Sequence, residues 1–215
     1  MKQYIVIGLG NFGTSVALTL NKNGYNVLAI DKDNEKVHTI AGNVTQAIEA
    51  DATDQMALQT LGVGNFDIAV VSIGDNTHAN ALTTVILKEL GVPYVIVKAQ
   101  DSLHGHLLIK LGADKIVYPE RDMGVKIAHN LISQNILDFL ELSPDYGIIE
   151  LPVPDRMIGK NLRELEIRSK YNVNVIAVKR GEDIKISMLT ELSIESGDII
   201  VVFGSNNDLR KLEML

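Results

Sequence analysis

The sequence has 215 residues, of which 46% are hydrophobic and 22% are charged, a composition that predicts a soluble protein with a packed core rather than a disordered chain. It contains no cysteine, which excludes disulfides, thiolate metal sites and cysteine nucleophiles, and its formal charge of -7 disfavours a general nucleic-acid binder. No apolar run is long enough for a membrane helix, and no signal-peptide pattern follows the first residue, so we expect a cytosolic protein.

Short apolar runs alternate with helical periodicity through the first part of the chain. The run Tyr4–Ile7 ends at a glycine and is typical of a strand buried on both faces of a parallel sheet. Phe12, Val16 and Leu20 then recur at helical spacing before Gly24. Further strands are expected at Val27–Ile30, Val44–Glu49, Ala69–Val71, Tyr94–Val97 and Lys115–Val117. This alternation over residues 1–118 predicts an α/β fold with a Rossmann-like, doubly wound parallel sheet.

The stretch Arg121–Leu142 is expected to be a long helix whose apolar residues cover two faces. One stripe contains Met123, Ile127 and Leu131, and the other consists of Ala128, Ile132, Ile136 and Leu140. A helix that is apolar on two sides must bury both, so we expect one side to pack against a second subunit. The alternative is an ordinary interdomain helix that the C-terminal domain covers.

The segment Ser143–Gly147, with the sequence SPDYG, is expected to end this helix and to mark a domain boundary. Strands are predicted after it at Ile148–Val153, Val173–Val178, Ile184–Met188 and Ile199–Phe203, with short helices at 160–170 and 207–214 and a hairpin turn at Arg180–Asp183. The sequence therefore predicts a nucleotide-binding domain at 1–120, a crossover helix at 121–142 and a small α+β domain at 145–215.

The motif Gly8-Leu9-Gly10-Asn11-Phe12-Gly13 stands between the first predicted strand and a helix, as in dinucleotide-binding folds. Gly8 permits a tight turn, Gly10 lets the backbone approach a pyrophosphate, and Gly13 lets the helix pack close to the sheet. Asp31 ends the second strand near the expected spacing and can accept hydrogen bonds from ribose hydroxyls, which disfavours NADP. The alternative is that the glycines serve only a strand–helix turn.

The sequence favours a binding module over an enzyme. It has no G-K-[ST] loop for nucleotide hydrolysis and no G-x-S-x-G nucleophile elbow. The residues left after the nucleotide domain are fewer than dehydrogenases commonly use to build a substrate pocket. A small NAD-dependent oxidoreductase is the runner-up interpretation, and a nucleotide-binding scaffold without a channel partner is the third.

Several segments carry a resemblance to a known family. They are Gly8–Gly13, Val27–Asp31, Ala50–Asp54, Val71–Asn76, Ile96–Ala99 and Tyr118–Met123. In this order, and with this second domain, they resemble the cytosolic regulatory subunits of bacterial Trk/Ktr potassium uptake systems. Those subunits are built from an N-terminal and a C-terminal RCK (regulator of potassium conductance) domain, and the resemblance covers essentially the whole chain.

The resemblance implies a regulator that forms an octameric ring of dimers on the inner face of the cell membrane, beneath a potassium-transporting subunit. ATP and ADP would favour different ring shapes and so gate transport, with NAD(H) as a further candidate ligand. The residues that match the family's nucleotide pocket, beyond the glycine-rich loop, are Asp31, Lys32, Asp51, Ala52, Thr53, Ile73, Gly74, Lys98, Ala99 and Glu120.

Glu120 matches a family carboxylate near the terminal phosphate that can hold Mg2+ or Ca2+, a chemistry that suits a hard cation. The alternative for Glu120 is a solvated charge at a helix start. Many relatives carry arginine where this chain has Asn11, and that arginine reaches toward the terminal phosphates of a neighbouring nucleotide. Asparagine supplies no charge there, which weakens the expected preference for ATP over ADP.

Gram-positive members of the family bind cyclic di-AMP at the interface between C-terminal domains. The residues that match this site are Ile167, Arg168, Asn174 and Val175, and Met188 stands where relatives often have proline. The resemblance therefore implies cyclic di-AMP as a possible second ligand. The alternative is that Ile167 and Val175 are core residues and that Arg168 is a solvated charge.

Overall fold

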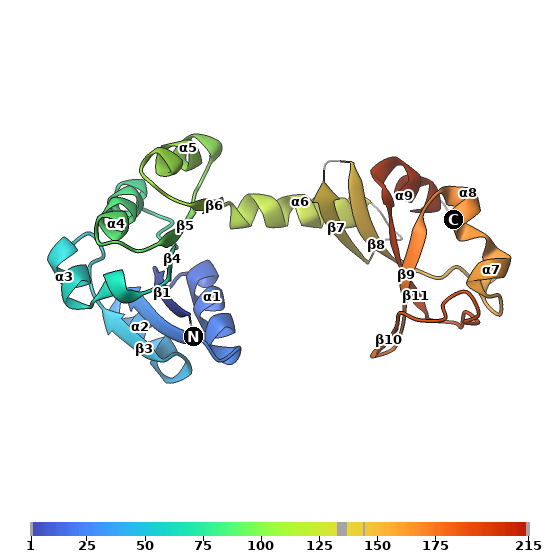
Figure 1. Cartoon of the computed structure of the whole chain (residues 1–215), viewed down its shortest axis with the longest axis horizontal. Coiled ribbons are helices and arrows are strands. Elements are labelled where there is room, and N and C mark those ends of the chain that lie inside the picture. Colours follow the sequence, from blue (N-terminus) through green and yellow to red (C-terminus); the bar gives the residue numbers. More distant parts are fainter. Residues whose placement is uncertain (1, 133–136, 144, 214–215) are drawn as a thin grey trace. The chain divides into compact units, whose positions relative to one another are not determined.

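The computed structural model describes residues 2–132, 137–143 and 145–213 (Figure 1). The chain divides into two compact units, Met1–Arg121 and Asp122–Leu215, each with its own sheet and core. Within the described residues, no helix is long and apolar enough to span a membrane.

The first unit contains a six-stranded parallel sheet with the strand order β3-β2-β1-β4-β5-β6. Its strands are β1 (Gln3–Ile7), β2 (Asn26–Asp31), β3 (Gln46–Glu49), β4 (Ile68–Val71), β5 (Tyr94–Lys98) and β6 (Lys115–Val117). The order reverses direction between β1 and β4, which is where open α/β sheets bind ligands. The predicted doubly wound sheet is confirmed, although β3 begins at Gln46 rather than at Val44.

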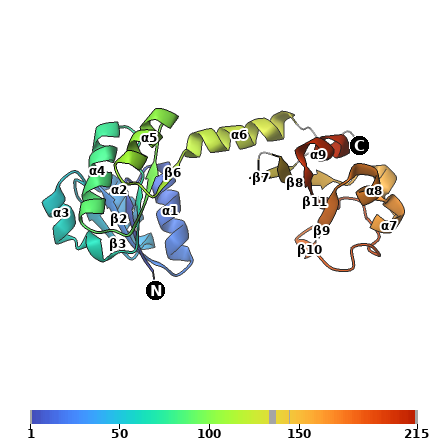
Figure 2. The same ribbon diagram turned by 45° about the horizontal axis from the view of Figure 1, so that its top comes forward.

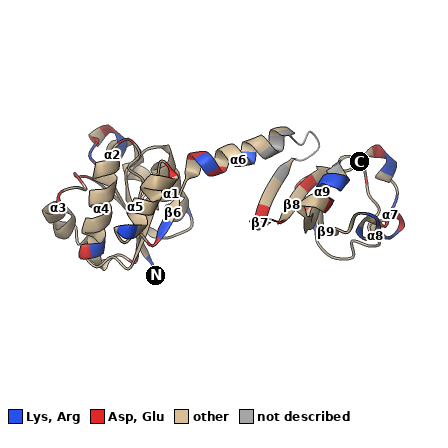
Figure 3. Ribbon diagram, turned by 90° about the horizontal axis from the view of Figure 1, so that it is seen from above, with Lys and Arg blue, Asp and Glu red and all other residues tan. Residues whose placement is uncertain are grey.

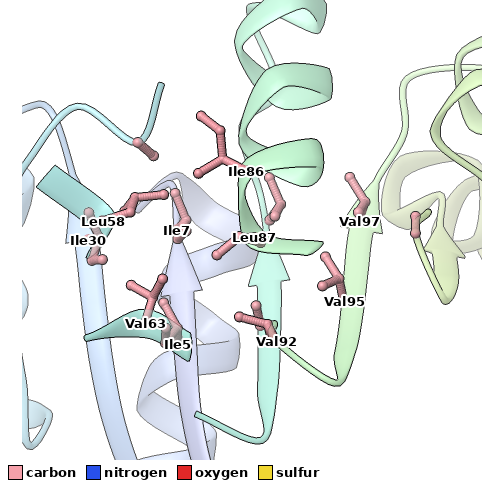
Figure 4. Packing of buried hydrophobic residues seen from close by; sticks show 14 of the residues in the cluster. Ile5, Ile7, Ile30, Leu58, Val63, Ile86, Leu87, Val92, Val95 and Val97 are labelled. Carbon is pink, nitrogen blue, oxygen red and sulfur yellow. The ribbon is translucent and has the colours of Figure 1, made fainter. Parts of the chain in front are cut away.

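Helices cover both faces of this sheet. The helices are α1 (Asn11–Lys22), α2 (Asn34–Ile40), α3 (Gln55–Thr60), α4 (Thr77–Glu89) and α5 (Ser102–Lys110), with short 3-10 turns at Ala41–Asn43 and Val63–Asn65. Successive strand residues point to opposite faces, so Val6 packs with α1 and α2, while Ile5 and Ile7 pack with α3, α4 and α5. Figure 2 shows the sheet between α1 and α4, and Figure 4 shows Ile7, Leu58 and Leu87 in the second of these clusters.

Four of these helices begin with an Asp or Asn side chain that caps their first turn. Asp33 accepts a hydrogen bond from Glu35 N at 3.0 Å, and Asp54 accepts one from Met56 N at 2.9 Å. At the start of α4, Asn76 accepts a hydrogen bond from Ala79 N at 2.9 Å. At the start of α5, Asp101 accepts one from His104 N at 2.8 Å. These caps satisfy backbone donors that the helix itself leaves unpaired, and they set where each helix starts. The helix α1 has Gly10 in this position, which has no side chain to offer.

The second unit contains a five-stranded antiparallel sheet with the order β10-β9-β11-β8-β7. Its elements are β7 (Asp138–Ser143), β8 (Tyr146–Pro152), a 3-10 turn (Asp155–Met157), α7 (Leu162–Leu165), α8 (Ile167–Tyr171), β9 (Asn174–Arg180), β10 (Asp183–Lys185), β11 (Ile199–Ser205) and α9 (Asn206–Glu213). Ile149, Ile200 and Val202 of the sheet pack with Leu209 and Leu212 of α9. The predicted small α+β domain is thus confirmed.

The prediction of one helix over Arg121–Leu142 is wrong beyond its first half. The helix α6 runs over Pro119–Ile132, and Asp138–Ser143 forms the strand β7, which pairs with β8. Leu140 lies opposite Ile148 and therefore belongs to no helical stripe. Pairing with β8 satisfies the backbone groups of a segment whose apolar spacing suggested a helix. Ile136, and the side chain of Ile132, lie outside the described residues.

The segment Ser143–Gly147 connects two strands of one sheet, since Ser143 pairs with Tyr146. It was expected to mark a domain boundary, and its residues Ser143 and Tyr146 instead belong to paired strands within the second unit. The boundary between the two compact units falls earlier, after Arg121.

Two smaller differences and two agreements concern the second unit. The expected helix at 160–170 is divided into α7 and α8 by Glu166, whose φ of 51° is left-handed and cannot continue a helix. The expected strand Ile184–Met188 is shorter, because β10 ends at Lys185 and Met188 has a φ of 54°. The helix expected at 207–214 corresponds to α9, and the hairpin turn at Arg180–Asp183 is confirmed by the pairing of its two end residues.

Candidate nucleotide-binding site

A cavity of about 400 Å³ lies at the carboxyl edge of the first unit's sheet, where the strand order reverses. All the nucleotide residues predicted from the sequence line it except Gly13 and Ala99. They are Gly8, Gly10, Asn11, Phe12, Asp31, Lys32, Asp51, Ala52, Thr53, Ile73, Gly74, Lys98 and Glu120. They come from loops that are far apart in sequence, and the parallel sheet brings them together because its strands all end at the same edge.

The glycine-rich loop has the geometry that its sequence predicts. Gly8 has a φ of 91°, and a Cβ on it would lie 2.8 Å from the backbone carbon of Ser72. A Cβ on Gly13 would lie 1.9 Å from the carbonyl oxygen of Gly8, so Gly13 allows α1 to pack against the loop but does not line the cavity. Gly10 has open space around its Cα, and the first N–H groups of α1 are left for an anion.

Asp31 is 8% exposed, and both of its carboxylate oxygens accept backbone hydrogen bonds. Its Oδ2 accepts from Leu9 N at 2.6 Å, and its Oδ1 accepts from Asp33 N at 2.9 Å. Lys36 Nζ lies 4.0 Å from Oδ2. Asp31 therefore joins β2 to the glycine-rich loop, a role that the sequence pattern did not reveal. The same carboxylate borders the cavity, where a ribose hydroxyl is the predicted partner.

The loop after β3 forms a second wall and is held by its own side chains. Asp51 Oδ1 accepts hydrogen bonds from Thr53 N at 2.9 Å and from Thr53 Oγ1 at 2.7 Å. The hydroxyl of Thr53 is the main cause that lowers the pKa of Asp51 below its ordinary value, and Lys32 adds to the effect. Thr83 Oγ1 donates to the carbonyl of Ala52 at 3.1 Å and ties this loop to α4.

Lys98 and Glu120 meet in an ion pair at the other end of the cavity. The side chain of Lys98 is 15% exposed and that of Glu120 is 72% exposed. A Cβ on Gly74 would lie 3.6 Å from Lys98 Nζ, so the lysine reaches from β5 toward the loop after β4. The hydrogen bond from Lys98 is the main cause that lowers the pKa of Glu120.

Two positioning residues were not predicted from the sequence. Asn80 on α4 is fully buried, and its Nδ2 donates to the carbonyls of Ile73, at 2.7 Å, and of Lys98, at 3.0 Å. Gln100 Nε2 donates to the carbonyl of Gly74. These bonds connect the loops after β4 and β5. One sequence feature could have indicated the role of Asn80. The inner face of α4 carries the polar residues Asn80, Thr83 and Thr84, and a buried polar side chain needs a hydrogen-bond partner.

Further residues line the cavity without having been predicted as site residues. They are Ile7, Lys36, Ala50, Ser72, Asp75, Asn76 and Ala79. Ala99 was predicted to line it, but Ala99 is 1% exposed and belongs to the hydrophobic core, with its N–H bonded to the carbonyl of Val117. The wall at the end of β5 is therefore made by Lys98.

The residues expected to bind cyclic di-AMP do not form one pocket within the described part of a single chain. Ile167 is 3% exposed in the core of the second unit, and Val175 packs against the same core, as the alternative interpretation held. Asn174 and Met188 are exposed. Arg168 borders a shallow cleft lined by Leu162, Arg163, Glu166, Ser169, Asn172 and Thr190, which includes none of the other four candidates.

The described residues contain no cluster of three or more His, Asp or Glu side chains that could hold a metal ion by themselves. Glu120 faces the cavity as an exposed carboxylate, so it could supply one oxygen ligand to a hard cation. The remaining ligands would have to be water and phosphate oxygens, which is the usual arrangement for Mg2+ bound together with a nucleotide.

The fold and the cavity define a Rossmann-type protein whose nucleotide-binding unit is joined to a small α+β unit. Family models agree, because the TrkA-N domain matches residues 4–119 and the TrkA-C domain matches residues 147–215. The chain is 45% identical over 212 residues to Ktr system potassium uptake protein C of Bacillus subtilis, covering 99% of this chain and 96% of the relative. It is 38% identical to Ktr system potassium uptake protein A of Vibrio alginolyticus, in an alignment that covers 100% of this chain and 98% of the relative. The chain belongs to the Trk/Ktr family of potassium uptake regulatory proteins.

Solved structures show the same fold at low sequence identity. The GsuK channel superposes with a TM-score of 0.71 and 19% identity, covering 99% of this chain and 39% of that one. The GsuK RCK domain superposes with a TM-score of 0.68 and 18% identity, covering 100% of this chain and 47% of that one. This chain therefore spans less than half the length of those solved chains.

Proposed function

We propose that this protein is the nucleotide-sensing regulatory subunit of a potassium uptake system, which binds ATP and ADP in the cavity of its first unit. The observation that carries the proposal is the cavity itself. It combines the uncapped start of α1, the carboxylate of Asp31 and the ammonium of Lys98 at one sheet edge. An anion is favoured at the helix start, a ribose at the carboxylate and a phosphate at the ammonium.

The regulated partner would be an integral membrane potassium-transporting subunit. The support is the similarity over nearly the full chain to relatives named as Ktr system potassium uptake proteins. ATP and ADP would favour different arrangements of the assembled subunits and so gate transport. The chain would act by binding and without turnover.

Self-association of the subunit, as a dimer that builds an octameric ring, is part of the same proposal. One of the two apolar stripes predicted for the helix supports self-association. Its residues Met123, Ile127 and Leu131 lie on α6, and their side chains are 55%, 51% and 76% exposed. Leu103 on α5 is 81% exposed. Large apolar side chains exposed in this way favour a protein interface.

Mg2+ or Ca2+ is proposed to bind with ATP through Glu120, and NAD(H) and cyclic di-AMP remain candidate ligands. A thermal-shift series with ATP, ADP, NAD, NADH and cyclic di-AMP tests these assignments, because a ligand that binds only the folded state raises stability by RT ln(1 + [L]/Kd). ATP and ADP are expected to raise the melting temperature. Turnover of NADH would favour the oxidoreductase alternative instead.

The regulatory role needs a second experiment. Membrane vesicles that contain a Ktr-type transporting subunit are expected to take up potassium at a rate that depends on this protein and on whether ATP or ADP is present. A transport rate that is the same with and without the protein would contradict the regulatory role, whatever the nucleotide affinity.

A further inference from the structure

We propose that Lys98 senses the charge of the bound phosphate by exchanging one anionic partner for another: Glu120 while the cavity is empty, and the terminal phosphate once a nucleotide is bound. This inference rests on the proposed function and specifies how its site distinguishes nucleotides. The starting observation is the ion pair between Lys98 and Glu120 in the wall of the cavity.

Lys98 needs an anion beside it. Its side chain is only 15% exposed, and an ammonium withdrawn from water is unfavourable unless an anion replaces the lost hydration. Its backbone is also fixed, because Asn80 Nδ2 donates to its carbonyl at 3.0 Å. The backbone that carries the ammonium is therefore held at the cavity wall, and Lys98 Nζ lies 3.6 Å from the position of a Cβ on Gly74, in the loop after β4.

Glu120 can leave this pair at low cost. Its side chain is 72% exposed, so water can hydrate the released carboxylate. Glu120 is also the second residue of α6, and a negative charge is favourable in the first turn of a helix. Figure 3 shows charges of both signs at the start of α6. The two partners are thus unequal, because the lysine depends on an anion and the glutamate does not depend on the lysine.

The strand order indicates which phosphate reaches Lys98. Asp31 ends β2 and Lys98 ends β5, and β1 and β4 lie between them. Neighbouring strands are about 4.8 Å apart, so the two strand ends are separated by roughly 14 Å. With the ribose at Asp31 and the first phosphates at the start of α1, the phosphate farthest from the ribose lies nearest Lys98. ATP reaches farther than ADP and carries more charge there.

The exchange has a distinctive consequence for Glu120. Without a divalent cation, the glutamate competes with phosphate for Lys98 and so opposes ATP binding. With a cation, the released carboxylate is free to serve as a ligand and supports ATP binding. The effect of removing the Glu120 charge on ATP affinity should therefore reverse in sign between chelator and Mg2+.

The test is calorimetric titration of ATP and ADP, with EDTA present, into wild type, Glu120→Gln, Lys98→Met and the double variant. Glu120→Gln should raise the affinity for ATP about three- to tenfold and the affinity for ADP by less. This range corresponds to the loss of an interaction whose strength lies between that of an exposed ion pair and that of a charge-assisted hydrogen bond. In the Lys98→Met background, the same change should have a clearly smaller effect, and the double-mutant cycle measures this coupling.

Asp75→Asn is the matched control. Asp75 also lines the cavity, and its substitution removes the same formal charge without involving Lys98. If Asp75→Asn tightens ATP as much as Glu120→Gln does, or if Glu120→Gln has no effect in EDTA, the exchange is refuted although nucleotides bind. If wild type binds neither nucleotide, the proposed function itself fails. Glu120 is exposed, so Glu120→Gln should fold. Its comparison with wild type and Asp75→Asn therefore tests the exchange even if Lys98→Met is destabilised.

Discussion

The carboxylate of Asp31 accepts a 2.6 Å hydrogen bond from the backbone N–H of Leu9, which joins the end of β2 to the glycine-rich loop before α1. A residue predicted to recognise ribose therefore also holds the loop that faces the phosphates. Both functions meet in a side chain that is 8% exposed, so changes at Asp31 should affect folding stability and ligand affinity together.

Asp31→Ala should weaken ATP and ADP binding to a similar extent, because both nucleotides present the same ribose. Loss of a charged acceptor should cost about 1.5–3 kcal/mol, or roughly ten- to a hundredfold in affinity. The melting temperature should also fall, since Leu9 N and Asp33 N lose their acceptor. Asp54→Ala is a suitable control, because Asp54 caps α3 outside the cavity and should lower stability alone. Unchanged ADP affinity by calorimetry in Asp31→Ala would contradict the ribose assignment.

Asn11→Arg should widen the ratio of ATP to ADP affinity. Asn11 is the first residue of α1 and lines the cavity, so an arginine there adds a charge near the terminal phosphates. Ser15→Arg adds the same charge one helical turn later, at an exposed residue outside the cavity wall. Titration of both nucleotides into the two variants should show the change only in Asn11→Arg, and an equal ratio in both would be evidence against this account of phosphate sensing.

Asn80→Ala should weaken both nucleotides and lower stability. The change leaves the partly buried carbonyls of Ile73 and Lys98 without this donor, at a cost of about 1–3 kcal/mol. The loops after β4 and β5 should then become more mobile, which hydrogen exchange can measure. Thr84→Val provides the comparison, because Thr84 Oγ1 bonds only within α4, to the carbonyl of Asn80. Normal affinity in Asn80→Ala would show that Asn80 does not position the site.

Ile127→Asp should reduce the assembly state of the protein. Ile127 lies on the exposed apolar stripe of α6, and a charge there would be strongly unfavourable if a second subunit covers it. Light scattering at micromolar concentration is expected to show an oligomer for wild type and a smaller species for Ile127→Asp, while Ile127→Leu should behave as wild type does. A monomeric wild type would end this interpretation of α6.

The second unit should lose stability in acid through Asp198. Its side chain is fully buried, and both of its oxygens accept hydrogen bonds of 2.8 Å from Arg180. These bonds are the main cause that lowers the pKa of Asp198 below its ordinary value of 3.8, against the opposing effect of burial. The stabilisation is therefore present above the ordinary value and is lost as the pH falls through the lower, folded-state value.

Asp198→Asn should remove this pH dependence and destabilise the second unit by about 2–4 kcal/mol, because Arg180 loses its buried partner. Hydrogen exchange of the β11 amides between pH 2 and 7 would measure both effects. Asp183→Asn is the control, because it changes an exposed carboxylate that lies opposite Arg180 across the hairpin turn. It should leave the stability of the second unit nearly unchanged. If the stability of Asp198→Asn decreased at acid pH as much as that of wild type does, other carboxylates would have to cause the decrease.

The elements of the first unit follow closely from its sequence because their signals are local and agree with one another. Tyr4–Ile7 is a continuous apolar run, Gly8 and Gly13 stand where close backbone approaches leave no room for a Cβ, and Asp31 ends the second strand. The helix predicted over Arg121–Leu142 failed where a local pattern met a nonlocal partner. The apolar residues of this stretch are spaced as in a helix, but the hydrogen bonds of β7 are completed by β8, which follows it in the chain.

Residue type, spacing and family resemblance were sufficient to predict most of the candidate nucleotide site, since the carboxyl ends of parallel strands always meet at one edge. The sequence could not show which atoms contact one another across that edge. Lys98 and Glu120 are separated by a helix and a strand, and Asn80 bonds to the carbonyl of Ile73, in the loop after β4, and to that of Lys98, at the end of β5. Only the packed sheet determines these contacts, because hydrogen bonds and ion pairs depend on distances of a few ångströms that residue order alone does not specify.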